Sequence, residues 1–449
     1  MISYTSLCSH MLFPLHERLK GHGTVAQLKR LERSQWWQVE DLERYRRQRL
    51  VYLLQSARRL VPYYRDLLRT AGEPRDAAST LQVLADLPFL TKSVIREQGS
   101  RMIAESATKL RHFSTGGSTG EPLRFQVGVD RVTHDVAAKW RATRWWGVDI
   151  GDPEVVLWGS PIELGTQDRA RWLRDRILRT HLLPAFRMSV EQMTRYLQII
   201  RQVRPAIVFG YPSAIALLAT HARDTRSRLD DVGVRVVFCT GETLLPDHRE
   251  VIETVFGAPV ANGYGSREAG FIAHECPQGS LHVSAEDIIV EVVDESGRQM
   301  PAGVEGELVV THLATAAFPM VRYKTGDIGV MSVRRCDCGR TLPVLAEVRG
   351  RSTDMIRTAD GNIMHGLALI YVLRECPGVA AFKIVQKTLQ SVQVFIVPGA
   401  GYGPLTDQRI REGLRARMGE ATAVDVQVVP QIQPERSGKY RYVVSEVRQ

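Results

Sequence analysis

Residues 113–122 read Phe-Ser-Thr-Gly-Gly-Ser-Thr-Gly-Glu-Pro, and this glycine-rich segment says most about what the chain is. Its glycines let backbone amides turn toward an anion, and its hydroxyl groups add further donors. The residues concerned are Ser114, Thr115, Gly116, Gly117, Ser118, Thr119 and Gly120. No Gly-Lys-Ser/Thr ending follows, so it is not a Walker A loop, and residues 123–127 indicate a strand where a dinucleotide fingerprint needs a helix. The segment predicts a phosphate-binding loop, with a flexible hydroxyl-rich hairpin loop as the alternative.

The segments that follow alternate between buried strands and amphipathic helices. Strands are expected at residues 155–158, 206–209 and 234–238, and helices at 187–203 and 213–222. Strand, helix and strand in succession indicate an α/β fold with a sheet of parallel character. Shorter β-like runs at 288–293 and 306–310 flank a turn signal, Asp-Glu-Ser-Gly, at 294–297.

The two ends of the chain differ from this middle part. Residues 1–110 have a mainly helical pattern, with breaks at Pro62 and Pro88. The last hundred residues alternate as half-buried strands at 392–397 and 424–429, with a helix candidate at 407–418 between them. This pattern predicts a small α+β unit at the C-terminal end.

Composition limits the classes of protein that need to be considered. Hydrophobic residues make up 44% and charged residues 24% of the 449 residues, which is typical of a globular protein with two or three domains. No apolar run approaches the ~20 residues of a membrane helix, and no secretory leader is recognisable, so a cytoplasmic enzyme is expected. The net charge is +10, but the densest basic run, residues 29–49, has interleaved acidic residues and suits an amphipathic helix with a solvated face. No nucleic-acid partner is expected.

Four further segments accompany the glycine-rich loop in a fixed order. They are residues 263–268 (Gly-Tyr-Gly-Ser-Arg-Glu), 323–327 (Tyr-Lys-Thr-Gly-Asp), 350–354 (Gly-Arg-Ser-Thr-Asp) and 437–441 (Ser-Gly-Lys-Tyr-Arg). Together with the loop they resemble the ordered motifs of the adenylate-forming superfamily. Residues 61–65, 87–92, 210–213 and 319–323 narrow the resemblance to phenylacetate–CoA ligases and the CapK-like and coenzyme F390 synthetase-like proteins. The resemblance implies a large N-terminal adenylation domain, residues 1–349, of mixed sheets and flanking helices, and a mobile C-terminal lid domain, residues 350–449.

The resemblance also implies an activity and a role for individual residues. ATP and a small carboxylic acid would form an acyl-AMP, and the acyl group would then pass to a thiol. The loop would hold the phosphates, Glu268 would hold Mg²⁺, and Lys439 would be catalytic. The remaining nucleotide-binding residues would be Glu242, Gly263, Tyr264, Gly265, Asp327 and Arg351. Read singly, these residues have ordinary structural alternatives: Asp327 in a turn, Tyr264 in a core, Glu268 at the start of a helix.

The acyl acceptor and the acid are less well defined. The sequence departs from the family pattern at Arg267, at Thr353 and after Ile356, which weakens the expectation of coenzyme A more than that of adenylation. The alternatives are a carrier-protein phosphopantetheine, or an alcohol or amine. A non-catalytic, zinc-stabilised binding protein is the alternative from another class. Family geometry would place the acid pocket at Trp158, Tyr211 and Gly241, without identifying the acid; oligomeric state is not indicated.

Three of the six cysteines and one histidine form two close pairs, Cys276 with His282 and Cys336 with Cys338. Sulfur and imidazole are the ligands that zinc prefers, and Cys-x-Cys followed by Gly resembles a zinc knuckle. Some phenylacetate–CoA ligase relatives have similarly placed residues. Four protein ligands predict a structural zinc ion, and packed reduced cysteines are the alternative.

Overall fold

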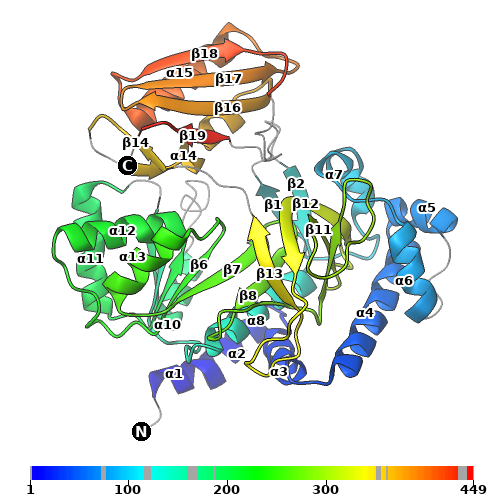
Figure 1. Cartoon of the computed structure of the whole chain (residues 1–449). Coiled ribbons are helices and arrows are strands. Elements are labelled where there is room, and N and C mark those ends of the chain that lie inside the picture. The colour runs from blue at the N-terminus through cyan, green and yellow to red at the C-terminus, as the bar shows by residue number, and fades with distance from the viewer. Residues whose placement is uncertain are drawn as a thin grey trace. The chain divides into compact units, whose positions relative to one another are not determined.

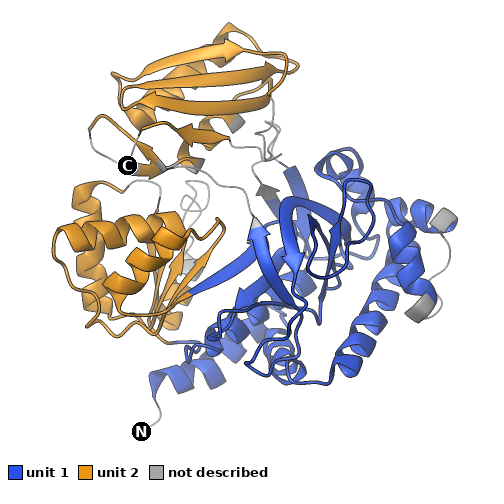
Figure 2. Cartoon of the chain, viewed as in Figure 1, with its two compact units in different colours: residues 1–115, 123–151, 261–350 blue, residues 116–122, 152–260, 351–449 orange. Residues whose placement is uncertain are grey.

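The computed structural model describes residues 3–71, 77–115, 123–158, 169–185, 188–349, 355–360, 363–432 and 442–447 (Figure 1). The chain divides into two compact units, shown in Figure 2. Unit 1 comprises residues 1–115, 123–151 and 261–350, and unit 2 comprises residues 116–122, 152–260 and 351–449. The division into domains at residues 349 and 350 stays a prediction. Among the described helices, none is both long enough and apolar enough to cross a bilayer.

The first part of unit 1 is helical. Its elements are α1 (Tyr4–Leu7), a π-helical turn (Cys8–Leu12), α2 (Phe13–Leu19), α3 (Thr24–Ser34), α4 (Val39–Leu60), α5 (Pro62–Ala71), α6 (Ala77–Asp86), α7 (Lys92–Gln98) and a 3₁₀ turn (Gly99–Met102). The two expected breaks lie at helix boundaries: Pro62 is the first residue of α5, and Pro88 follows the end of α6. The expectation of one amphipathic helix over residues 29–49 is wrong, because α3 ends at Ser34 and α4 begins at Val39.

Unit 1 also contains the β-rich part of the chain. A hairpin pairs β1 (Arg111–Thr115) with β2 (Leu123–Val127), followed by α8 (Val129–Arg144). Seven strands then lie in the order β10-β11-β12-β13-β9-β8-β7. Their bounds are β7 (Val260–Ser266), β8 (Gly270–Glu275), β9 (Leu281–Val283), β10 (Ile288–Val293), β11 (Glu305–His312), β12 (Met320–Met331) and β13 (Val344–Arg349). These strands pair in antiparallel fashion, and β7 with β8 and β8 with β9 are joined by short connections.

Unit 2 begins with the parallel α/β part. Strands lie in the order β6-β5-β3-β4 and pair in parallel. Its strands are β3 (Glu154–Trp158), β4 (Thr180–Pro184), β5 (Ile207–Gly210) and β6 (Val236–Thr240), and its helices are α10 (Arg169–Leu178), α11 (Val190–Val203), α12 (Pro212–Asp224) and α13 (Pro246–Phe256). β5 and β6 are buried along their whole length, as expected for strands of a covered parallel sheet. The predicted α/β fold class is confirmed.

The C-terminal residues of unit 2 have a core of their own. A four-stranded sheet has the order β18-β17-β16-β19, and a separate hairpin pairs β14 with β15. The elements are β14 (Met355–Arg357), β15 (Ile363–His365), α14 (Leu367–Arg374), β16 (Val379–Thr388), β17 (Ser391–Pro398), α15 (Pro404–Met418), β18 (Ala423–Val428) and β19 (Val443–Ser445). Buried side chains from α14, α15 and the sheet form one cluster, including Leu369, Phe382, Ile396 and Leu414.

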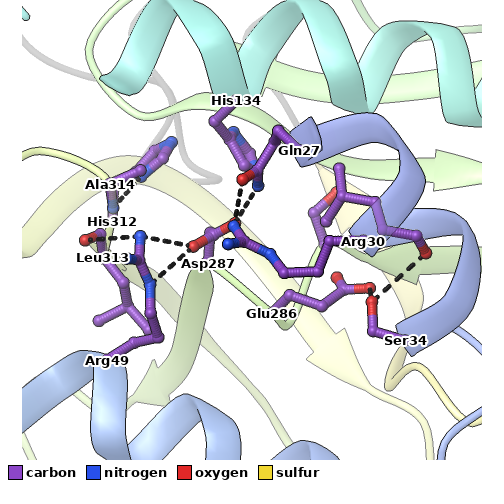
Figure 3. A network of polar contacts seen from close by, with 12 residues as sticks. Gln27, Arg30, Ser34, Arg49, His134, Glu286, Asp287, His312, Leu313 and Ala314 are labelled. Carbon is purple, nitrogen blue, oxygen red and sulfur yellow. Dashed lines mark hydrogen bonds and ion pairs between the residues drawn. The ribbon is translucent and has the colours of Figure 1, made fainter. Parts of the chain in front are cut away.

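A network of buried charges fastens the N-terminal helices of unit 1 to its strands (Figure 3). The fully buried Asp287 accepts hydrogen bonds from Gln27 at 2.6 Å and from Arg49 at 3.1 Å, and forms an ion pair with Arg30 at 3.5 Å. Burial alone would raise the pKa of Asp287, but His134 and the two arginines outweigh burial and lower this pKa to about 2. Two arginines of the basic run, Arg30 and Arg49, therefore point into the protein.

The neighbouring Glu286 is held in a similar way. Ser34 donates to its carboxylate at 2.7 Å, and Arg141 of α8 forms an ion pair with it at 2.6 Å. Glu286 and Arg141 are both fully buried, so each charge is stable there only because the other is present.

Candidate active site and metal centre

Glu268 lies in the short connection between β7 and β8, and its carboxylate is almost fully buried. The residue is 6% exposed. The phenol of Tyr323, on β12, donates a hydrogen bond to Oε1 at 3.1 Å. The ammonium group of Lys92 lies 3.6 Å from the same oxygen. A carboxylate can bind a metal ion, and a neighbouring ammonium group can interact with phosphate oxygens, so this arrangement fits a site for a metal–phosphate ligand.

Lys92 reaches Glu268 because the chain before α7 is fixed to a strand. Leu90 forms a parallel bridge with Tyr323: its N–H donates to Arg322 O at 2.9 Å, and its carbonyl accepts from Lys324 N–H at 3.0 Å. Thr91 then caps α7 by accepting from Val94 N–H. Lys92 is thus the first residue of a helix whose start is tied to β12.

Tyr264 and Asp327 form a second pair in unit 1. Tyr264 is on β7 and Asp327 is on β12, directly after Gly326, which has φ of 76°. The Tyr264 phenol donates to Asp327 Oδ2 at 3.0 Å, and the Asp327 N–H donates to Thr325 Oγ1 at 3.1 Å. A carboxylate held in this way is an acceptor-only group of the kind that can bind hydroxyl donors. Gly263 and Gly265 flank Tyr264 on the same strand.

Part of the predicted nucleotide site lies outside the described residues. β1 and β2 pair so that Thr115 is opposite Leu123, which brings the two ends of the predicted phosphate loop together. Ser114 and Thr115 end β1. Gly116, Gly117, Ser118, Thr119, Gly120, Arg351 and Lys439 are not among the residues that the structure describes.

The four predicted zinc ligands come together in unit 1. Sγ of Cys276 lies 3.6 Å from Sγ of Cys336, and Sγ of Cys338 lies 3.3 Å from Nε2 of His282. All four ligand atoms lie within 4.8 Å of one another. Thiolates bound at ~2.3 Å at the corners of a tetrahedron are ~3.8 Å apart, so the observed spacing fits a tetrahedral metal site.

The histidine of this cluster is prepared to act as a ligand. Its Nδ1 lies 3.2 Å from the carbonyl of Leu342, which can only accept, so Nδ1 carries the proton and Nε2 keeps its lone pair toward the sulfurs. Burial, with Arg340 and Arg141 nearby, lowers the pKa of His282 to about 4, which keeps the ring neutral. A backbone partner that fixes the tautomer is typical of metal-bound histidine.

A second group of potential ligands, His134, Asp135 and His312, does not fit a metal ion. His312 Nδ1 accepts the N–H of Ala314 at 3.2 Å. In a neutral ring the proton then lies on Nε2, the nitrogen that faces Asp135 at 4.0 Å. A protonated nitrogen has no lone pair for a metal, so this group is a polar part of the core.

The residues predicted for the acid pocket lie together in unit 2. The rings of Trp158 and Tyr211 are stacked, with centroids 4.1 Å apart and planes at 17°. Gly241 has φ of 86°, and a Cβ there would lie 3.1 Å from the Tyr211 ring and 3.3 Å from that of Trp158. The two rings therefore form an aromatic wall, and a side chain at position 241 would be strained by its backbone conformation and crowded against both rings.

Glu242 belongs to this group in unit 2. Its Oε2 accepts the N–H of Ser213 at 3.3 Å, at the start of α12. A carboxylate in this place satisfies a free amide and interacts favourably with the helix dipole. Burial, and then the charge of Glu242, raise the pKa of Tyr211 above its ordinary value.

Comparison with known proteins identifies the class to which this geometry belongs. Residues 113–317 match the AMP-binding enzyme family, and residues 356–446 match the CapK C-terminal domain. The chain therefore belongs to the adenylate-forming superfamily and is an AMP-forming ligase. Within that superfamily it belongs with CapK and the phenylacetate–CoA ligases, which confirms the resemblance.

Curated relatives share about a quarter of their residues with this chain. Protein CapK of Staphylococcus aureus is 24% identical over 381 residues, covering 82% of each chain. A phenylacetate-coenzyme A ligase of Thermus thermophilus is 26% identical over 338 residues, covering 72% of this chain and 73% of the relative. The fold matches that of a 2-hydroxyisobutyryl-CoA ligase in complex with 2-HIB-AMP and CoA, with a TM-score of 0.65, 22% identity and coverage of 92% and 91%.

Proposed function

We propose that this AMP-forming ligase activates a small carboxylic acid with ATP and Mg²⁺ and transfers the acyl group to the thiol of coenzyme A. The observation that carries the proposal is the grouping on β7, β12 and the β7–β8 connection of a tyrosine–aspartate pair and a buried, cation-flanked glutamate. The nucleotide needs the tyrosine–aspartate pair, the metal needs the glutamate, and the phosphates need the lysine. A non-catalytic binding protein has no use for all three.

Each group has a part in binding the nucleotide. The Asp327 carboxylate would accept from the ribose hydroxyls, with Tyr264 fixing its orientation and lying against adenine. Lys92 and the residues 114–120 would face the phosphates. Glu268 would hold Mg²⁺, which, when bound, would offset part of the triphosphate charge.

The reaction brings two anions together, so positive charge has to be placed where they meet. A carboxylate oxygen of the acid forms a bond to the α-phosphorus as the bond to pyrophosphate breaks. In the second half-reaction the thiol sulfur attacks the acyl carbon, its proton is lost to solvent or a base, and AMP leaves. Lys439 is the proposed cation at the α-phosphate, acting as a point charge.

Coenzyme A is proposed as the acceptor because four curated relatives are named phenylacetate-coenzyme A ligases, at 25–27% identity. A carrier-protein phosphopantetheine presents the same thiol, and an alcohol or amine is a third possibility. The membership of the chain among AMP-forming ligases favours an enzyme over a non-catalytic binding protein. For the acid, the stacked Trp158 and Tyr211 favour a flat or compact apolar group.

We also propose that Cys276, His282, Cys336 and Cys338 bind one structural zinc ion. The support is the spacing of the sulfur and nitrogen atoms and the tautomer that Leu342 imposes on His282. Four protein ligands complete a tetrahedral shell and exclude water, so this metal would hold the β8–β9 region to the 336–338 loop and take no part in the reaction.

The deciding experiment is ATP–pyrophosphate exchange with purified protein, Mg²⁺ and a panel of aryl, medium-chain, hydroxy and amino acids. Exchange that depends on one class of acid is the expected result. AMP release is then measured with coenzyme A, a phosphopantetheinylated carrier protein, or an amine as acceptor. The proposal of coenzyme A is wrong if AMP release rises only with the carrier protein or the amine.

A further inference from the structure

The turn that carries Glu268 is fixed by an arginine from another part of unit 1. Arg131, on α8, donates from Nη1 to the carbonyl of Glu268 at 2.8 Å and from Nη2 to the carbonyl of Arg267 at 3.2 Å. One guanidinium group thus holds two consecutive carbonyls of the β7–β8 connection. Arg131 is only 3% exposed, so these bonds are shielded from water.

Asp135 orients this arginine. It lies one helical turn further along α8, and its Oδ2 accepts from Arg131 Nε at 2.9 Å. Its other oxygen, Oδ1, lies 3.4 Å from the backbone nitrogen of Phe271, just beyond the turn. The pair therefore contacts the connection at both ends, at Arg267 and Glu268 on one side and at Phe271 on the other.

The turn is built to admit the pair. Gly270 has φ of 78°, and a Cβ at this position would lie 2.6 Å from Arg131 Nη2 and 2.6 Å from Asp135 Oδ1. A side chain at residue 270 would displace the guanidinium or the carboxylate. Ser266 closes the turn from within, because its Oγ accepts the N–H of Ala269 at 2.9 Å.

We propose that Arg131, oriented by Asp135, is a positioning residue that sets the place of the Glu268 carboxylate for binding Mg²⁺-ATP. This inference rests on the proposed function, in which Glu268 holds the metal. Arg131 itself would touch neither metal nor nucleotide. It fixes the backbone on either side of the Glu268 Cα. This restricts the conformations of the Glu268 side chain to those in which its carboxylate contacts Lys92 and Tyr323.

The geometry requires an arginine. Three N–H groups of one planar fork are engaged at the same time, in three directions, by two carbonyls and a carboxylate. A lysine keeps the charge, but its single ammonium group cannot span the same three acceptors. Arg131→Lys therefore tests the positioning role without removing the buried charge.

Another buried arginine of the same helix provides a matched control. Arg141 is fully buried and pairs with Glu286 at 2.6 Å, and its guanidinium also donates to Leu31 and Ser284, which lie outside the β7–β8 connection. If Arg131 were only a buried structural ion, Arg131→Lys and Arg141→Lys would have the same effect. Both would lower thermal stability, and neither would change Mg²⁺-dependent nucleotide binding.

The experiment measures ATP binding by the full-length protein calorimetrically, with and without Mg²⁺, in the absence of any acid. The ratio of the two dissociation constants is the magnesium effect. Glu268→Gln is expected to abolish it, and Arg131→Lys to reduce it about tenfold or more, as for other residues that orient metal ligands. Arg141→Lys is expected to keep the magnesium effect of the unmodified protein.

Asp135→Asn is the second variant if Arg131→Lys does not fold, and the same reduction is expected because the guanidinium loses its orienting charge. A full magnesium effect in the folded Arg131 or Asp135 variants, with its loss in Glu268→Gln, overturns the inference and leaves the proposed function standing. An equal reduction in Arg141→Lys also overturns it. A magnesium effect that Glu268→Gln does not change removes the role of Glu268, and the inference with it.

Discussion

The phenol of Tyr264 donates a hydrogen bond to the carboxylate of Asp327, 63 residues further along the chain, at 3.0 Å. This bond joins two strands whose sequences match separate motifs of the adenylate-forming superfamily. It restricts the rotation of both side chains and fixes the direction in which the Asp327 carboxylate points.

We expect Asp327→Ala to raise the KM for ATP about tenfold to a hundredfold, because hydrogen bonds to a charged acceptor contribute roughly 1.5–3 kcal/mol. Tyr264→Phe removes only the orienting hydroxyl and should raise this KM less. Pyrophosphate exchange at varied ATP measures both. An unchanged KM in Asp327→Ala would show that the carboxylate has only a structural role in its turn.

Lys439→Ala should slow formation of the acyl-adenylate about a hundredfold to a thousandfold, which is the range for loss of one group that stabilises transition-state charge. Transfer of the acyl group from a preformed adenylate should be little affected. Single-turnover assays separate the two half-reactions. Arg441→Ala, two residues away, is the control for a general loss of positive charge. Equal loss of both half-reactions in Lys439→Ala contradicts the role given to this lysine.

Cys336→Ser should remove the metal together with part of the stability of unit 1. We expect zinc to fall from roughly one ion per chain to near zero, and the melting temperature to fall with it, because binding energy at a structural site is folding energy. Cys376→Ser replaces a buried thiol outside the cluster and should leave the zinc content unchanged. Elemental analysis and thermal melts test this. Full zinc content in Cys336→Ser would rule out the ligand set.

Acid should destabilise the protein through its buried histidines. Burial, and then Arg131, lower the pKa of His312 from 6.5 to about 3; burial, and then Arg141, lower that of His274 to about 3. Below pH 6.5 the unfolded chain binds protons that the folded chain excludes. Stability should therefore be complete above pH 6.5 and fall progressively toward pH 3.

The slope of this pH dependence can be measured by urea unfolding between pH 7.5 and 5. His274 and His312 together should take up about two protons on unfolding at the acid end of this range, in addition to the protons bound by other groups. His312→Gln should remove about one of them. An unchanged slope in His312→Gln would show that His312 titrates normally in the folded protein.

Local sequence patterns predicted the elements of the fold well. The strand expected at residues 123–127 is β2, and the strands expected near 155, 206 and 234 are β3, β5 and β6 of a parallel sheet. Alternation and apolar runs are local signals, so they suffice where tertiary contacts agree with them. The basic run was misread because Arg30 and Arg49 bind Asp287, 257 and 238 residues away, and no local pattern contains that partner.

The candidate site was predicted less evenly. Motif resemblance selected Tyr264, Glu268 and Asp327, and the two cysteine-containing pairs were visible as spacing. Lys92 and Tyr323 lie in the family-like segments 87–92 and 319–323, but only the folded structure shows that both contact Glu268. Arg131 gave no signal at all, since an arginine in an amphipathic helix looks like a solvated residue until its acceptors are known.

The burial of Asp287 has a consequence for how the protein is made. Arg49 leaves the ribosome 238 residues before its partner Asp287, a delay of roughly 12–48 s at 5–20 residues per second. During that time Arg30 and Arg49 lack the carboxylate with which they pair in the folded protein. We therefore expect the Arg49–Asp287 contact to form only after β10 begins to be translated, so the N-terminal helices cannot complete their packing before then.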